Sequence, residues 1–153
     1  LVDVAQRYCR LIDQEGEMPG GWLESLFSLL PQLHSAVTAL NAYDTGEMPL
    51  PEVDLDERFE LYTRLRKLLG ERDSYWLEFD ASPEQLHMSG SLADDLTDIY
   101  FDLQHGLALL DEAWPQRAAQ AWQSSYRAHW GQHLVDAERH LYALKVRDQI
   151  AIN

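Results

Sequence analysis

The segment from Gly90 to Leu110 carries aspartates at the spacing of one helix face. Asp95, Asp98 and Asp102 lie three and four residues apart, so a helix turning about 100° per residue places their carboxylates at one edge of its leucine stripe. Carboxylates grouped in this way can bind a divalent cation or orient histidine side chains.

The segment from Ser125 to Leu141 carries histidines in a similar way. His129, His133 and His140 fall at one edge of an aromatic stripe, and the spacing of the first two sets their imidazoles one helical turn apart. Such a pair is a common ligand set for zinc and other transition metals, and a carboxylate or His34 could supply a third ligand.

The two segments are expected to lie side by side. Antiparallel neighbours bring corresponding edges together, and a turn near residues 111–115 sets Asp95 level with His133 and Asp98 level with Trp130. We therefore predict a polar seam between the two helices. Its members are Asp95, Asp98, Asp102, His129, His133 and His140.

Two interpretations of the seam are open. In the first, each histidine hydrogen-bonds an aspartate, and the seam only joins the helices. In the second, Asp95, Asp98, His129 and His133 bind a divalent metal. The histidine spacing resembles that of metal-binding four-helix bundles of the DinB type, which add a histidine from an earlier helix.

Other catalytic motifs fit the sequence poorly. The string Asp94-Asp95-x-x-Asp98 resembles the aspartate-rich motif of isoprenoid synthases, but those enzymes are much longer and need a second acidic motif. Helical nucleotide pyrophosphatases bind magnesium through acidic pairs on two facing helices, whereas the facing helix here offers histidines. The sequence has no Gly-rich phosphate loop and no G-x-S-x-G, H-E-x-x-H or C-x-x-C motif, so enzymatic activity is left open.

Composition limits the possible partners and the location. With 26 acidic and 12 basic residues, the net charge is −14, so no nucleic-acid partner is expected. The main basic cluster is small and consists of Arg64, Arg66 and Lys67. The lack of a long apolar run and of a signal peptide predicts a cytoplasmic protein with no membrane partner. Cys9 lies on an apolar face and is expected to be a buried thiol.

Helical periodicity recurs in five places, and no segment shows convincing strand alternation. The first predicted helix ends at Gly16, and the second spans residues 22–40, where Pro31 should kink or divide it. Asp54 can cap a third helix that ends at Gly70. The apolar side predicted for the third helix is Leu55, Phe59, Tyr62, Leu65 and Leu69.

The remaining two helices lie in the second half of the chain. Ser91 and Asp94 form a capping box at the start of the fourth, and the Trp114-Pro115 break separates it from the fifth, which runs towards Arg147. The segment between the third and fourth predicted helices, residues 71–90, is irregular and rich in aromatics. This pattern predicts a short helical turn and a loop packed on the bundle.

These elements predict a single all-α domain over residues 1–153. Short connections favour antiparallel neighbours, so the expected architecture is an antiparallel helical bundle of about five helices. The loop over residues 41–53 could cross the bundle.

Five strings, in order, resemble one bacterial family: AQRYCRLID, LLPQLHSA, RLRKLLGERDSYWLEFD, SGSLADDLTDIYFDLQHGLALL and AHWGQHLVDAERHL. The similarity spans nearly the whole chain and is most specific in the last two strings. The family is the one catalogued as domain of unknown function 5063. This resemblance implies a small all-helical cytoplasmic bacterial protein, and it carries over no activity, cofactor or catalytic residue.

The function predicted is binding of an unknown protein or small-molecule partner, with no demonstrable catalysis. The alternative is a metal-binding or metal-dependent helical-bundle enzyme centred on His129 and His133. A third hypothesis is self-association or partner docking through exposed aromatics among Trp22, Trp76 and Trp114, because interfaces favour such anchors.

Overall fold

The computed structural model describes residues 1–15, 20–41, 48–78 and 87–151. These ranges are mainly helical and confirm the all-α prediction. In chain order, the elements are α1 (Val2–Asp13), α2 (Trp22–Thr38), α3 (Leu55–Leu69), a 3-10 turn (Gly70–Arg72), β1 (Ser74–Glu78), β2 (His87–Ser91), α4 (Leu92–Asp111), α5 (Pro115–Ser125), a π turn (Tyr126–Trp130) and α6 (Gly131–Val146).

Local signals begin and end the helices where the sequence predicts. Asp54 caps α3 by accepting backbone hydrogen bonds from Asp56 at 2.9 Å and Glu57 at 3.2 Å. Gly70 ends the same helix at a φ of +55°, a conformation that favours glycine. Pro115 occupies the first turn of α5, where its missing N–H costs nothing.

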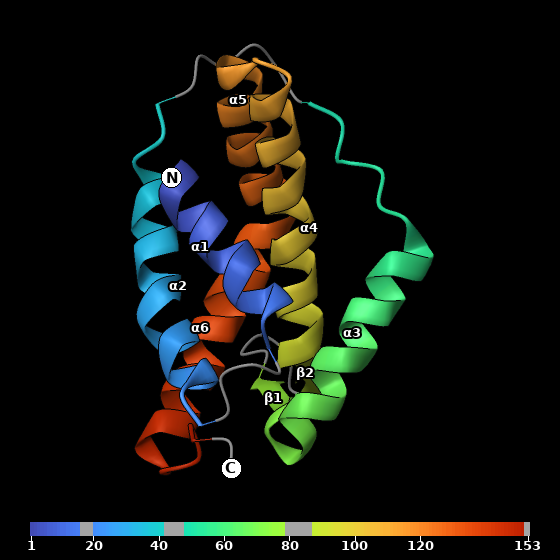
Figure 1. Ribbon diagram of the computed structural model, residues 1–153. Coiled ribbons are helices and arrows are strands. Elements are labelled where there is room, and N and C mark those ends of the chain that lie inside the picture. The colour runs from blue at the N-terminus through green and yellow to red at the C-terminus, as the bar shows by residue number, and fades with distance from the viewer. Residues whose placement is uncertain (16–19, 42–47, 79–86, 152–153) are drawn as a thin grey trace.

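The central helix of the bundle is α4, which packs against α1, α3, α5 and α6. Figure 1 shows α5 and α6 running back along α4, with α1 and α2 on one side and α3 on the other. Fully buried side chains fill the space between the helices. The largest of them are Trp22, Trp130, Tyr8, Ile12, Leu23, Leu26, Leu30, Leu33, Leu65, Leu69, Leu92 and Leu96.

Buried polar and thiol groups also join this packing. The Tyr8 hydroxyl donates to the Leu96 carbonyl at 2.7 Å, which ties α1 to α4. Cys9 is buried as expected, and burial raises the pKa of its thiol to about 12. None of the described helices is long and apolar enough to cross a membrane.

Of the two outcomes predicted at Pro31, a kink or a division of the second helix, the division is wrong, and the kink stays a prediction. α2 runs without interruption from Trp22 to Thr38 and contains Pro31. An internal proline costs a helix about 3 kcal/mol. Here Leu30 and Leu33, on either side of it, are fully buried, and their packing on the core holds both halves of α2 in one helix.

The apolar face of the third helix also differs from the prediction. Leu55 is 78% exposed and Phe59 is 64% exposed, whereas the predicted Leu65 and Leu69 are buried, together with Leu61. In the same half of α3, Leu61 is buried and Arg58 bonds Asp94 and Asp98 of α4, so Leu55 and Phe59 lie away from the face that contacts the bundle.

The aromatic segment forms a hairpin where we predicted a loop. The short helical turn is present at Gly70–Arg72, but it leads into β1, which pairs antiparallel with β2 in the register Tyr75 with Gly90. Each strand has only five residues and one partner, too short for the alternation of a strand to be recognised. The predicted helix end at Gly16, residues 42–47 of the loop, and residues 79–86 of the aromatic segment lie outside the described residues.

Candidate metal centre

A π turn interrupts the helix that carries the histidines. The sequence predicts one regular fifth helix, but α5 leads into the π turn over Tyr126–Trp130 and then into α6. Trp130, fully buried, donates its indole N–H to the Ser125 hydroxyl at 3.0 Å and lies edge-on to Tyr126. A Cβ at Gly131 would lie 2.4 Å from the Tyr126 carbonyl oxygen, so the turn requires glycine there. Turns of this kind are frequent at functional sites.

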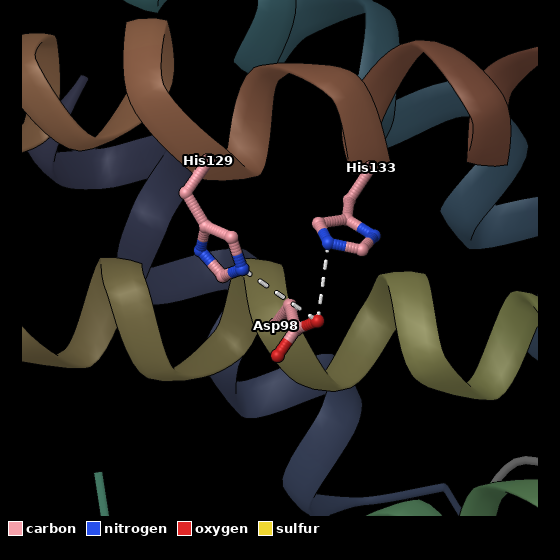
Figure 2. Close-up of side chains that lie close together, drawn as sticks. All are labelled: Asp98, His129 and His133. Atoms are coloured by element: carbon pink, nitrogen blue, oxygen red, sulfur yellow. Dashed lines mark ion pairs between the residues drawn. The ribbon is translucent and has the colours of Figure 1, made fainter. Parts of the chain in front are cut away.

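The π turn and α6 present two histidines to the aspartates of α4. Nδ1 of His133 donates to Asp95 at 2.8 Å, and Nδ1 of His129 donates to Asp102 at 2.7 Å. The other ring nitrogens, both Nε2, converge on one oxygen, Oδ2 of Asp98, at 3.1 Å from His133 and 3.8 Å from His129 (Figure 2). Asp98 therefore lies at the centre of the cluster.

Residues from two other elements hold the aspartates in place. Arg58 of α3 donates through Nε to Oδ1 of Asp98 at 2.9 Å and through Nη2 to Asp94 at 2.7 Å. Tyr75 of β1 donates its hydroxyl to Oδ2 of Asp95. A Cβ at Gly90, the strand partner of Tyr75, would lie 2.3 Å from the tyrosine ring, so this glycine makes room for the ring.

Sequence reasoning missed both Arg58 and Tyr75. Arg58 is one of twelve basic residues, and Tyr75 is one of several neighbouring aromatics, so neither has a distinguishing local pattern. The local signal is Gly90, a small residue that stands opposite Tyr75 in the pairing of β1 with β2.

Burial changes the acidity of three groups in the cluster. Burial raises the pKa of Asp95 to about 6, against the opposing effect of its hydrogen bonds with His133 and Tyr75. Burial likewise raises the pKa of Asp102, although His129 opposes it. For His133, burial lowers the pKa, but the hydrogen bond with Asp95 and the charge of Asp98 outweigh burial, so the net pKa is raised.

The raised pKa of Asp95 predicts a pH-dependent stability in the metal-free protein. Its folded pKa of about 6 exceeds the ordinary 3.8, so its stabilising contribution is present below about pH 4 and is lost as the pH rises to about 6. The variant Asp95→Asn cannot ionise there. Between about pH 4 and 7, we expect the free energy of unfolding of wild type to fall relative to Asp95→Asn by on the order of 2 kcal/mol. Urea denaturation at a series of pH values measures this difference, and a difference independent of pH would contradict the raised pKa.

Two of the predicted histidines contact other groups. Nε2 of His140 donates to the Arg72 carbonyl at 2.6 Å, and the His140 ring stacks on Tyr75. The partner of His140 is therefore a backbone carbonyl and not the predicted aspartate. His34 lies 2.8 Å from Glu138 and 3.3 Å from the Tyr126 hydroxyl. The described groups that could hold a metal with His129 and His133 do not include His34.

The geometry restricts what can lie between the two Nε2 atoms and Asp98. In a neutral imidazole whose Nδ1 carries the proton donated to its aspartate, Nε2 has a lone pair. In both histidines this lone pair faces the anionic Oδ2 of Asp98. Lone pairs and a carboxylate oxygen repel one another unless a proton or a cation separates them. One ligand atom each from Asp98, His129 and His133 lies within 4.8 Å of the others, which is close enough for one metal ion to bridge them. A second such group is Asp94, Asp95 and His133.

Comparison with known proteins identifies the family. The model of the family described as Domain of unknown function (DUF5063) matches residues 1–147. The chain belongs to this family. Among solved structures, protein BF1032 from Bacteroides fragilis resembles the DUF5063 chain with a TM-score of 0.76 and 23% identity over 94% of this chain and 89% of that chain. At this identity the likeness establishes the fold alone. No curated protein matches the chain.

Proposed function

We propose that this DUF5063 protein binds a divalent first-row transition metal, such as Zn²⁺ or Fe²⁺, through Nε2 of His129, Nε2 of His133 and a carboxylate oxygen of Asp98. The observation that carries the proposal is the convergence of both Nε2 atoms on Oδ2 of Asp98. Two imidazoles and one carboxylate form a ligand set that binds Zn²⁺ or Fe²⁺ and leaves other positions open.

The surroundings of the three ligands support this proposal. Metal-binding histidines usually donate their second ring N–H to a carboxylate, which fixes the ring and increases its basicity. Here Asp102 does so for His129 and Asp95 for His133, while Arg58 holds the second oxygen of Asp98. A seam that only joined two helices would not require the free nitrogens to point at a common atom.

The proposed ligand set is suited to catalysis by a metal-bound water or substrate. Three protein ligands leave coordination positions open, as catalytic sites do, whereas structural zinc sites are closed by four. The His129 side chain is 35% exposed and that of His133 is 22% exposed, so small molecules can approach from solvent. The metal would act as a Lewis acid or lower the pKa of a bound water.

Metal titration of chelator-treated protein tests the proposal. We expect one equivalent of Zn²⁺ or Co²⁺ to bind and raise the melting temperature, and Mg²⁺ and Ca²⁺, which prefer oxygen ligands, to have little effect. Affinity should fall from about pH 7.5 to pH 5.5, because the metal competes with protons for the histidines. Elemental analysis after reconstitution that finds no bound metal would refute the proposal.

Of the three tryptophans predicted as candidates for an interaction role, two are exposed. Trp22 is only 1% exposed and belongs to the core, so it is not a docking residue. Trp76 is 69% exposed and Trp114 is 51% exposed, and these two could anchor a protein partner or a second copy of the chain. Self-association stays a prediction, which light scattering over a dilution series would test.

A further inference from the structure

A hollow of about 250 Å³ lies between β1 and α6. Apart from the adjacent Arg139 and His140, the residues of α6 that line it follow at steps of three or four and so share one helix face. From β1 it is lined by Ser74, Tyr75 and Trp76, and from α6 and its end by Asp136, Arg139, His140, Ala143 and Arg147. The small side chain of Ala143, midway along this face, leaves the space open.

The charges around the hollow favour an anion. Arg139 and Arg147 form no ion pair with any of the described residues, although acidic residues outnumber basic ones in this chain by 26 to 12. The acidic residue of the lining is Asp136, which accepts from Gln132 at 3.2 Å. Two further carboxylates lie behind the walls, Asp95 at the Tyr75 hydroxyl and Asp73 near His140. Arginine binds carboxylate and phosphate groups with two parallel hydrogen bonds, which makes these the natural ligands of the two side chains.

The walls of the hollow favour a ligand with a flat apolar part. Tyr75 and Trp76 contribute aromatic surface on the β1 side. The Tyr75 ring is held in place by stacking on His140, with ring centroids 4.8 Å apart, and by its hydrogen bond to Asp95. His140 in turn is fixed through Nε2 on the Arg72 carbonyl, at 2.6 Å, so this wall is formed before any ligand arrives.

We propose that this hollow binds a small organic anion, with its carboxylate or phosphate group at Arg139 and Arg147 and its apolar part against Tyr75 and Trp76. The hollow contains none of the three proposed metal ligands, Asp98, His129 and His133, although its wall residue Tyr75 also bonds Asp95 beside them. The inference therefore stands whether or not those three residues bind a metal.

Calorimetric titration with benzoate and with phenyl phosphate tests the proposal and distinguishes the two anionic groups. We expect at least one of them to bind saturably below about 10 mM, and the neutral analogue benzamide to bind at least about fivefold more weakly. The double variant Arg139→Ala/Arg147→Ala should lose at least about tenfold in affinity. Ala143→Leu, which keeps both charges and fills the space, should lose a similar amount.

A charge-matched control separates the site from general electrostatics. Arg66 and Arg117 are exposed and lie outside the hollow, so Arg66→Ala/Arg117→Ala lowers the net charge equally and should retain wild-type affinity. Circular dichroism of each variant checks that it is folded. Equal affinity of wild type and the Arg139/Arg147 variant would overturn the proposal, as would the absence of saturation with both anions.

Discussion

Replacing Asp98 with alanine is expected to abolish transition-metal binding. Oδ2 of Asp98 is the atom on which Nε2 of both His129 and His133 converges, so its removal leaves only two neutral ligands. Changes behind a metal ligand already cost about 10–100-fold in affinity, and the loss of the ligand itself should cost more than about a hundredfold. Zn²⁺ titration followed by calorimetry, on the chelator-treated variant and wild type, measures this loss.

Two further variants give the Asp98→Ala result its meaning. Asp111→Ala removes an exposed carboxylate from the other end of α4 and should bind Zn²⁺ as wild type does. His133→Ala should also lose the metal-induced increase in melting temperature. If Asp98→Ala retained wild-type affinity, the proposed coordination would be wrong, and the group formed by Asp94, Asp95 and His133 would be the one to test.

Replacing Trp130 with alanine is expected to have the largest effect on stability, about 3–5 kcal/mol. The side chain is fully buried, and its indole N–H bonds Ser125 at 3.0 Å and the Trp122 carbonyl at 3.3 Å within the π-turn region. The substitution leaves a cavity and removes the indole donor from the Ser125 hydroxyl, while the Trp122 carbonyl still accepts from the Tyr126 backbone N–H. Because His129 precedes Trp130 in the π turn, metal affinity should also fall. Urea denaturation followed by circular dichroism measures the stability change.

Matched variants separate the contributions of the Trp130 side chain. Trp114→Ala removes a half-exposed tryptophan and should change stability by no more than about 0.5 kcal/mol. Trp130→Phe keeps most of the ring and loses the indole donor, so it should cost about 1–3 kcal/mol and stay folded if the alanine variant does not. A loss below about 1 kcal/mol for Trp130→Ala would show that packing around the π turn tolerates the cavity.

Much of the bundle could be predicted because its signals are local. The caps at Asp54 and Ser91, the end at Gly70 and the break at Pro115 each act within a few residues of themselves. Pro31 shows the limit of such signals. Its local effect opposes the helix, but the burial of Leu30 and Leu33 on distant neighbours outweighs it.

The sequence by itself determined the helices and the edges on which their polar residues lie, because helical spacing depends only on the residue count. Spacing, together with an antiparallel turn near residues 111–115, brought Asp95 level with His133 and placed Asp98 in the same seam. The tertiary structure decided which nitrogen faces which oxygen. Arg58 and Tyr75 reach the cluster from α3 and β1, and the π turn that carries His129 is held by a buried indole. These contacts depend on packing between segments far apart in the chain, and no local pattern encodes them.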